Sequence, residues 1–372
     1  MEKININELN FDELEKFIES LDEKKFHAKQ IYKWIHRIGV LSFEDMTDIS
    51  KKLREKLNEV SYLLELKVLE CQKSKKDGTM KFLIELPDDN AIEAVLMKYK
   101  HGNTICVSSQ VGCRMGCKFC ASTKDGFARG LLASEIEGQL LTVERYTGEK
   151  ISNVVYMGIG EPLDNYDNVI KSIRLINYPL GLNIGARHIS LSTCGIVPNI
   201  YRLAEEKIQC TLSISLHATT DEKRRETMPI ANKYSLEELL KACKDYIKTT
   251  GRRISFEYAL IYEQNDSYED AIQLSKLLRG MIAHVNLIPV NEIKNGVYKK
   301  APEKNIENFM KTLNSCGIVT TVRRELGTDI DAACGQLRKK YIDKTGIKQK
   351  TWKKFNLFAI IFHKRWKNEI HS

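Results

Sequence analysis

Several features are missing from the 372-residue sequence. No run approaches the roughly 18 consecutive apolar residues that a membrane-spanning helix needs, and the first residues do not pair a basic leader with an apolar stretch as a secretory signal does. We therefore expect a cytoplasmic protein. With 42% apolar and 29% charged residues, the chain also lacks the composition of a collagen-like or disordered protein. Its length suggests about two domains.

The chain also has fewer acidic than basic residues. The chain has 58 Lys and Arg against 49 Asp and Glu, a formal charge of +9, which suggests an acidic partner such as nucleic acid. Eleven of the basic residues but only two of the acidic ones lie in residues 338–372, so the first 337 residues carry 47 of each sign. The positive excess belongs to the carboxyl terminus, and net charge alone is weak support for RNA binding.

The hydrophobic pattern changes along the chain. Residues 1–90 combine apolar positions at helical spacing with two strand-like runs around the turn at 75–78, which predicts a helical unit closed by strands. From residue 104, six strand-like runs alternate with six helical ones, so we predict an α/β fold with a parallel sheet, either doubly wound or curled into a full or partial barrel. Capping boxes are expected at two helix starts, at Ser134 with Glu137 and at Ser235 with Glu238.

Three of the ten cysteines form a motif directly after the first strand of this series. Cys113, Cys117 and Cys120 are spaced by three and then two residues. Reduced cysteines that cluster point to metal or redox chemistry. A structural zinc site needs four ligands, so three thiolates favour a [4Fe-4S] cluster with one iron free to bind another molecule. The alternative is a zinc site whose fourth ligand is His101 or a distant cysteine.

The cysteine spacing, together with Phe119 and the alternating strands and helices, resembles the radical S-adenosylmethionine enzymes. Residues 106–113, 158–165 and 329–337 are similar to motifs of the dual-specificity adenine carbon-2 RNA methyltransferases within that group. The resemblance runs from about residue 25 to residue 341. It implies methylation of adenine 2503 of 23S ribosomal RNA and adenine 37 of transfer RNAs, with a [4Fe-4S] cluster and S-adenosylmethionine as cofactors.

The same resemblance implies an organisation and a set of partners. It predicts an N-terminal RNA-binding unit over residues 1–90, a partial (β/α)6 barrel over 99–330 and a catalytic-cysteine segment over 331–344, followed by a tail over 345–372. The partners would be 23S ribosomal RNA, transfer RNA and an electron donor such as flavodoxin or ferredoxin. We expect a monomer without a membrane span.

Carbon 2 of adenine has no lone pair with which to attack a sulfonium methyl group, so its methylation calls for a radical route. In the mechanism that the resemblance implies, Cys334 takes a methyl group from one S-adenosylmethionine. A second molecule is cleaved to a 5′-deoxyadenosyl radical, which removes hydrogen from the S-methyl group, and the methylene radical adds to the ring. After a base removes the ring proton, Cys106 attacks Cys334, releasing the RNA and leaving a disulfide to be reduced.

Outside the resemblance, Cys106 and Cys334 would each be read as small buried residues. Five further cysteines match no motif and are expected in the core or at the surface: Cys71, Cys194, Cys210, Cys243 and Cys316.

Glu93 aligns with the proton acceptor of the family. Alternation along its strand would place it on one face with Val95 and Met97, where apolar surroundings raise the pKa of a carboxyl group toward that of a useful base. The alternative is an exposed glutamate on an edge strand.

The cofactor-binding residues follow from the same alignment. Gly160 and Glu161 lie in a loop that resembles the GxGEP motif, in which the glutamate holds the methionyl amino group. This loop is not a dinucleotide fingerprint, because Leu163 stands where the third glycine would be. Five other residues at strand ends match cofactor contacts in the family, although each could be a turn or structural residue: Ser192, Ser215, Leu216, His217 and Asn291.

The two ends of the chain are less informative. Residues 28–57 resemble the small RNA-binding domain of the family, and four basic side chains there could contact phosphates or simply form a solvated helix face: Lys51, Lys52, Arg54 and Lys56. The tail over 345–372 mixes basic and aromatic residues, which suits RNA binding, a peripheral amphipathic anchor or a helix packed on the barrel. We assign it no function.

Two other functions compete with carbon-2 methylation. A related carbon-8 adenine methyltransferase, which confers antibiotic resistance, shares the cluster and both mechanistic cysteines, but it has alanine at the position of Pro162 and a cysteine at that of Val111. The non-enzymatic alternative is an RNA-binding protein with a structural metal site.

Overall fold

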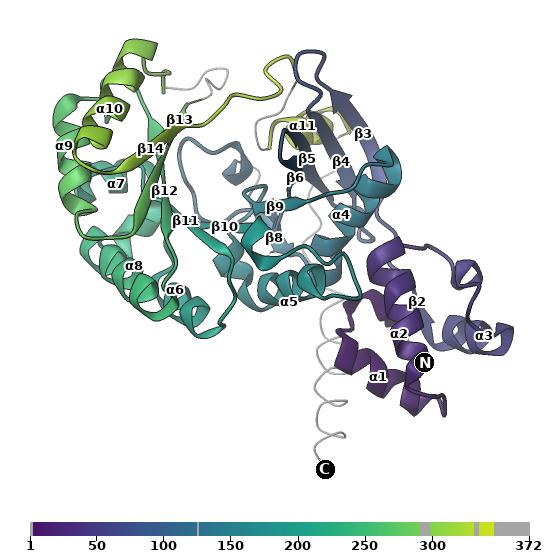
Figure 1. The fold of residues 1–372 in the computed structure, drawn as a ribbon. Helices are drawn as coiled ribbons and strands as arrows, with labels where there is room; N and C mark the ends of the chain where they lie inside the picture. Colours follow the sequence, from purple (N-terminus) through teal and green to yellow (C-terminus); the bar gives the residue numbers. More distant parts are fainter. Residues whose placement is uncertain (1–2, 125, 291–297, 331–334, 346–372) are drawn as a thin grey trace.

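The computed structural model describes residues 3–124, 126–290, 298–330 and 335–345. Helices cover the outer side of a curved sheet, and a small helical domain at the amino terminus packs against two of these helices (Figure 1). No helix in these ranges is long and apolar enough to cross a membrane.

The amino-terminal domain is built from three amphipathic helices, whose apolar faces meet in a core of their own: α1 (Phe11–Ser20), α2 (Phe26–Lys33) and α3 (Lys51–Val60). Helix α1 begins at a capping box, in which Asn10 and Glu13 satisfy each other's backbone N–H groups. Ala133 and Leu175 of the barrel helices belong to the same core. Buried His36 Nδ1 lies 2.7 Å from Glu137 Oε2, which fastens the domain to the barrel.

A ten-stranded sheet dominates the rest of the molecule. Seven neighbouring strands are parallel: β6 (Gly102–Cys106), β9 (Asn153–Tyr156), β10 (Ile189–Thr193), β11 (Thr211–Ser215), β12 (Ile254–Leu260), β13 (Ala283–Pro289) and β14 (Val319–Val322). The first six match the predicted series, and β14 is an added edge strand. The parallel strands form an open partial barrel, as expected.

Three antiparallel strands extend this sheet beyond β6: β3 (Lys67–Lys73), β4 (Met80–Glu85) and β5 (Ala91–Tyr99). The predicted hairpin at residues 75–78 joins β3 to β4. Both strands were expected in the amino-terminal unit, but β4 pairs with β5 along its whole length and so belongs to the sheet of the barrel. Pairing partners, unlike strand propensity, cannot be read from a local pattern.

Helices connect the parallel strands and cover the outer side of the sheet: α4 (Ala133–Thr147), α5 (Tyr166–Asn177), α6 (Val197–Glu205), α8 (Leu236–Thr250), α9 (Tyr268–Leu277) and α10 (Glu303–Ser315). Ser235 and Glu238 form the expected capping box at α8. The prediction for Ser134 is wrong, because α4 begins at Ala133 and its N-cap is Leu132, two residues before the predicted one. There Glu135, not Glu137, accepts the Leu132 N–H.

Candidate active site

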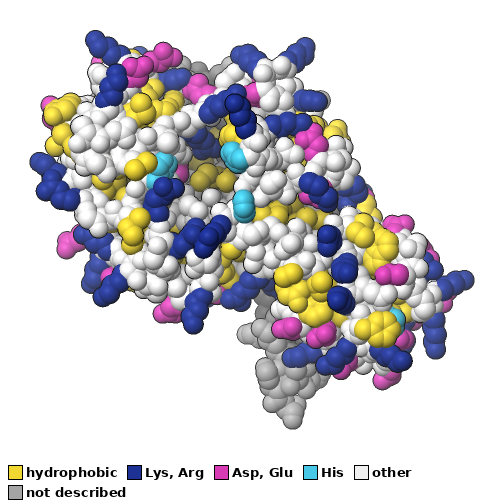
Figure 2. All heavy atoms as spheres, viewed as in Figure 1, with side chains coloured by type: hydrophobic (Ala, Val, Ile, Leu, Met, Phe, Trp, Pro, Cys, Tyr) yellow, Lys and Arg dark blue, Asp and Glu magenta, His cyan; other side chains and the backbone are white. Residues whose placement is uncertain are grey.

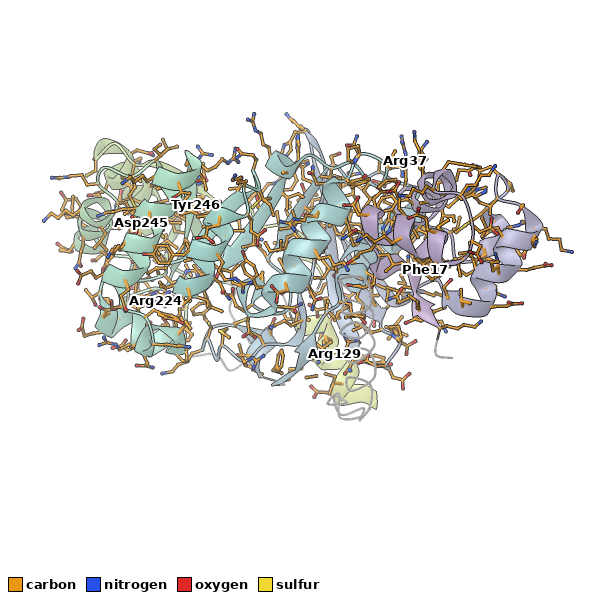
Figure 3. All side chains as sticks on the ribbon, turned by 90° about the horizontal axis from the view of Figure 1, so that it is seen from below. Phe17, Arg37, Arg129, Arg224, Asp245 and Tyr246 are labelled. Carbon is orange, nitrogen blue, oxygen red and sulfur yellow. The ribbon has the colours of Figure 1, made fainter. Side chains whose placement is uncertain are left out.

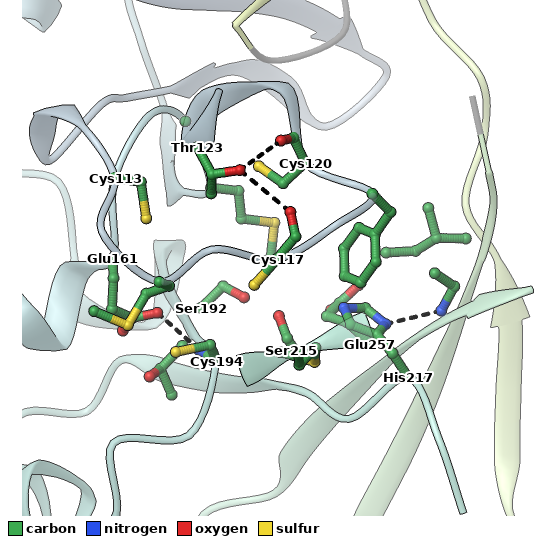
Figure 4. A pocket seen from close by; sticks show the side chains of 18 of the residues that line it. Cys113, Cys117, Cys120, Thr123, Glu161, Ser192, Cys194, Ser215, His217 and Glu257 are labelled. Carbon is green, nitrogen blue, oxygen red and sulfur yellow. Dashed lines mark hydrogen bonds between the residues drawn. The ribbon is translucent and has the colours of Figure 1, made fainter. Parts of the chain in front are cut away.

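A cavity of about 300 Å³ lies at the carboxyl ends of the parallel strands (Figure 4). Residues at or just after the ends of β9, β10, β11 and β13 line one side of it, and the cysteine loop lines the other. This is the edge at which parallel α/β sheets gather their functional residues. The described residues thus bring motifs from five separate parts of the chain to one space.

The cysteine loop follows the short strand β7 (Gln110–Gly112). Gly112 has a φ of +77°, and a Cβ atom there would lie 1.9 Å from the carbonyl oxygen of Gly126, so only glycine fits. The Thr123 hydroxyl donates to the carbonyl oxygens of Cys117 and Cys120, which fixes the curvature of the loop (Figure 4). The sequence therefore shapes a tight loop that presents its cysteines to the cavity.

All three predicted cluster ligands, Cys113, Cys117 and Cys120, line this cavity. The three thiols therefore border one shared space, as the ligands of a cluster must. His101, the alternative zinc ligand, instead stacks on Tyr99 and does not line the cavity.

Burial raises the pKa of the Cys113 and Cys117 thiols to about 12. Without metal these thiols are therefore neutral at pH 7. Because thiolate is the form that binds iron, metal binding at this loop must release protons. The donor set of three thiols around one cavity fits a [4Fe-4S] cluster.

The loop after β9 is held by close backbone contacts. A Cβ atom at Gly158 would lie 2.6 Å from the carbonyl oxygen of Val107, and one at Gly160, whose φ is +110°, would lie 2.6 Å from the Cβ of Gln110. Glycine is therefore required twice in this motif for packing and conformation. These contacts place Glu161 at the cavity wall.

Glu161 is buried, and its carboxylate accepts the N–H groups of Leu163 at 3.0 Å and Cys194 at 2.8 Å. Burial raises the pKa of its carboxyl group. Glu161 forms no ion pair with any residue that the structure describes. A buried carboxylate that lines a cavity and lacks a cation is suited to bind an ammonium group.

Ser192, Ser215 and His217 also line the cavity, as the sequence analysis expected of cofactor contacts. Leu216 does not line it, because its side chain is fully buried in the main hydrophobic core. Its backbone supports the cavity wall instead, because the Leu216 N–H donates a hydrogen bond to the carbonyl oxygen of Glu257, which lines the cavity. Asn291 lies outside the described residues.

His217 is held in one orientation. Its Nδ1 accepts the Ala259 N–H at 2.9 Å, and Phe119 packs edge-on against the ring at 5.0 Å (Figure 4). Burial, with a smaller effect of Arg224, lowers the pKa of His217 to about 3. The ring is therefore neutral, and because Nδ1 is an acceptor, Nε2 carries the proton. His217 can donate one hydrogen bond from Nε2.

Cys106 and Glu93 lie on the inner face of the sheet. Val95 pairs with Cys106 across β5 and β6, so alternation places both residues on the face that also carries Glu93. Both site residues are buried, which excludes the exposed-edge alternative for Glu93. Cys334 lies outside the described residues, and so does the tail beyond residue 345.

The surroundings of Glu93 are more polar than strand alternation indicated. The Lys81 ammonium lies 2.9 Å from Oε2, the Gly335 N–H donates to Oε2 at 2.6 Å, and the Arg338 N–H donates to Oε1 at 2.7 Å. The last two groups lie at the start of α11 (Gln336–Thr345), so Glu93 caps this helix. The carboxylate holds the residue that directly follows Cys334 in the sequence.

Three residues at the cavity escaped the sequence analysis. Cys194 was expected to be an ordinary thiol, yet it lines the cavity and belongs to one buried cluster with Cys117 and Met228. Glu257 is a buried carboxylate in the cavity wall, bonded to Asn286 Nδ2 at 2.7 Å. Arg224 lies buried behind the wall. None of them belongs to a recognisable local motif, so only the folded chain reveals them.

Two family models match the chain. The model described as "Ribosomal RNA large subunit methyltransferase N-terminal domain" covers residues 4–63, and the "Radical SAM superfamily" model covers residues 107–275. Among solved structures, a radical SAM methyltransferase from Sphaerobacter thermophilus superposes with a TM-score of 0.85 at 39% identity, over 90% of this chain and 98% of that one.

Curated relatives match over nearly the whole chain. The probable dual-specificity RNA methyltransferase RlmN of Clostridium perfringens (strain SM101 / Type A) is 55% identical over 92% of this chain and 99% of its own length. The protein of the same description from Clostridium novyi (strain NT) is 57% identical over 91% and 98%. The chain therefore belongs to the radical SAM dual-specificity RNA methyltransferases of the RlmN family.

Proposed function

We propose that this enzyme methylates carbon 2 of adenine 2503 in 23S ribosomal RNA and of adenine 37 in transfer RNAs, by way of a methylated Cys334. The observation that carries the proposal is the hydrogen bond from the Gly335 N–H to Glu93. It ties the residue after Cys334 to the sheet face on which Cys106 lies. The family's methyl carrier, proton acceptor and resolving thiol would thus meet at one place.

The cofactors find matching groups in the cavity. Cys113, Cys117 and Cys120 would hold a [4Fe-4S] cluster, and Glu161 would bind the amino group of S-adenosylmethionine, with Ser192, Ser215, His217 and Asn291 as further contacts. When bound, the cluster supplies the electron that cleaves the cofactor, and flavodoxin or ferredoxin would supply that electron in turn. The buried, neutral Nε2–H of His217 is suited to donate to a cofactor oxygen.

The protein's own side chains act in three steps. The Cys334 thiolate attacks the sulfonium methyl carbon, and S-adenosylhomocysteine leaves. Once the methylene bridge to the RNA has formed and the adduct has given up one electron, for which the cluster would be the acceptor, Glu93 takes the proton from carbon 2. The Cys106 thiolate then attacks the Cys334 sulfur, which breaks the bond from that sulfur to the methylene carbon. This carbon gains a proton and becomes the new methyl group, and the Cys106–Cys334 disulfide that remains is reopened by a thiol reductant. Proton transfer to Glu93 competes with the interactions that its carboxylate already makes with the Lys81 ammonium and with the N–H groups of Gly335 and Arg338.

Product analysis tests the reaction. Ribosomal and transfer RNA from cells with and without the protein are digested, and 2-methyladenosine is separated from 8-methyladenosine by chromatography and mass spectrometry. We expect 2-methyladenosine to require the protein in both RNA classes. The carbon-8 methyltransferases have a cysteine at the position of Val111, whereas in this chain Val111 packs in the main hydrophobic core, so this position does not support the carbon-8 alternative. Finding 8-methyladenosine would nevertheless replace the proposal with it, and finding neither would refute both enzymatic readings.

Cysteine variants test the residue roles. A Cys106→Ala enzyme should accumulate a covalent complex with RNA, because the thioether bridge forms and nothing resolves it, whereas Cys334→Ala should form none. Glu93→Gln should also accumulate the complex, since the ring proton stays in place. Cys316→Ala is the matched control, because Cys316 is exposed and does not line the cavity. A Cys106→Ala enzyme with normal turnover would remove Cys106 from the mechanism.

A further inference from the structure

Arg224 has an unusual position for an arginine. It lies on α7 (Asp221–Thr227), is completely buried and is labelled among the barrel helices in Figure 3. Its guanidinium donates from Nε to the carbonyl oxygen of Leu216 at 3.2 Å, and from Nη2 to those of Cys194 at 2.7 Å and Ser215 at 3.3 Å. All three acceptors are neutral groups at the ends of β10 and β11.

The positive charge of Arg224 is not balanced by an ion pair. No carboxylate that the structure describes lies within ion-pair distance of it, and Nη1 has no hydrogen-bond partner. Arg129 gives a comparison within the same chain. It is almost as buried, but it pairs with Asp88 at 2.7 Å and Glu135 at 2.6 Å. An arginine keeps its proton at physiological pH, so a buried and unpaired one is costly unless another negative charge is near.

The groups around Arg224 indicate where that charge comes from. Cys194 and Ser215, whose carbonyl oxygens it binds, line the cavity, and so does Met228 at the end of its helix. The Thr227 carbonyl of α7 accepts the N–H of Lys118 in the cysteine loop at 2.9 Å. Among the groups that can carry negative charge, the Cys194 and Cys117 thiols interact with the Arg224 guanidinium more strongly than Asp221 does. Helix α7 therefore holds the cation directly behind the cysteine loop.

We propose that Arg224 is a positioning residue whose buried positive charge offsets the negative charge of a cluster bound by Cys113, Cys117 and Cys120, and so makes that cluster easier to reduce. The inference rests on the cluster of the proposed function but assigns a residue that has no part in it so far. Reduction adds one negative charge at the cluster. A nearby cation stabilises the reduced form more than the oxidised form, and more so at low dielectric.

Three variants separate charge from packing. Arg224→Gln removes the charge and keeps an amide donor, whereas Arg224→Lys keeps the charge with fewer donors. Arg225→Gln makes the same change of charge on the neighbouring residue of α7, which is exposed and therefore screened. The measurements are iron and sulfide content, and the midpoint potential of the cluster by electron paramagnetic resonance during an anaerobic redox titration.

We expect Arg224→Gln to hold the cluster and to raise the ratio of oxidised to reduced cluster about tenfold at a fixed potential. For a one-electron couple, this corresponds to a midpoint potential about 59 mV lower. Arg224→Lys and Arg225→Gln should stay within a factor of three of the unmodified protein. If Arg224→Gln cannot retain iron, a loaded Arg224→Lys with an unchanged potential still supports the role of charge.

Two results would overturn the inference. One is a loaded Arg224→Gln protein with the unmodified potential. The other is loss of iron from both Arg224 variants, which would make the hydrogen bonds to the three carbonyl groups decisive. The outcome is independent of RNA product analysis, so a wrong methylation position leaves the inference standing. If the unmodified protein binds no [4Fe-4S] cluster, both the inference and the proposed function fail.

Discussion

The Lys81 ammonium lies 2.9 Å from Glu93 Oε2, and the two side chains are almost completely buried on the inner face of the sheet. Lys81 lies on β4 and Glu93 on β5, so the ion pair joins two of the three antiparallel strands that extend the barrel sheet. Glu93 also caps α11 through Gly335 and Arg338. One carboxylate therefore connects this extension to the start of the helix that follows Cys334.

Removing the ammonium should destabilise the protein more than removing the whole pair. Lys81→Met leaves the Glu93 carboxylate buried without its cation, which typically costs about 3–5 kcal/mol, whereas replacing both charges by apolar groups is often nearly neutral. We expect Lys81→Met to lower the free energy of unfolding in urea by this order, and Lys81→Met/Glu93→Leu to recover part of the loss. Glu93→Leu alone completes the double-mutant cycle, because its loss also contains the hydrogen bonds to Gly335 and Arg338, and additive losses in the cycle would show that the pair is not coupled.

Gly160 is so closely packed that we expect its substitution to damage the cofactor site. Alanine there must accommodate both a φ of +110° and an overlap with Gln110, so the loop that carries Glu161 has to move. We expect Gly160→Ala to fold but to lose at least tenfold in affinity for S-adenosylmethionine, measured by calorimetry on the cluster-loaded protein. Gly251→Ala is the matched control, because Gly251 also has a positive φ, +66°, but nothing lies within 4 Å of an added Cβ.

Equal cofactor affinity in the two glycine variants would contradict this account of the motif. Gly251→Ala should cost only about 1–2 kcal/mol of stability, which is the ordinary cost of a left-handed alanine.

The parts of the site that the sequence predicted are those encoded locally. Cys113, Cys117 and Cys120 lie within eight residues, and Gly160 and Glu161 are adjacent, so spacing alone was informative. The N–H groups that hold Glu93 come from residues 242 and 245 positions further along the chain. The role of Arg224 depends on three carbonyl groups that the ends of two strands, β10 and β11, bring to it. Such contacts depend on strand order and register, which no short window of sequence contains.

The local signals that failed did so for physical reasons. Ser134 and Ser235 have the same spacing to a glutamate, but Glu135 bonds the Leu132 N–H and starts α4 before Ser134. Leu216 stands between two cavity residues, and strand alternation turns its side chain into the core.

His217 should make the stability of the protein depend on pH in a defined window. Burial lowers its pKa to about 3, whereas an unfolded histidine titrates near 6.5. Between these two pH values the imidazole is protonated in the unfolded state but not in the folded state. The contribution of His217 to the free energy of unfolding is therefore complete above pH 6.5 and is lost as the pH falls toward 3. The free energy of unfolding changes by at most about 1.4 kcal/mol per pH unit in this window.

The check is urea unfolding of the cluster-free protein at several pH values from 7.5 to 4.5, compared with His217→Asn. Asparagine tolerates the positive φ of 58° at this position and does not titrate. The difference in stability between the two proteins should shrink or reverse as the pH falls. A difference that stays constant across the window would show that His217 is not held neutral.

The basic residues of α3 should not contribute equally to RNA binding. Figure 2 shows Lys and Arg side chains spread widely over one face of the molecule, so position must decide which of them meet phosphates. Lys51 and Lys52 are exposed, and the ion pair of Lys51 with Glu55 at 3.8 Å is solvated. By contrast, Arg54 bonds Glu44, and Lys56 bonds Leu21 and Glu23 within the amino-terminal domain. The last two side chains already serve the fold of that domain.

We therefore expect Lys51→Ser and Lys52→Ser each to reduce the slope of log affinity against log salt concentration by about 0.7–0.9, the value for one phosphate contact. Affinity for a transcript of the target ribosomal RNA region would be measured by fluorescence anisotropy from 50 to 300 mM salt. Lys241→Ser and Lys244→Ser, exposed on α8, make the same change of charge elsewhere. If all four variants lower the slope equally, the effect comes from overall charge, and the amino-terminal domain has no special role in holding the RNA backbone.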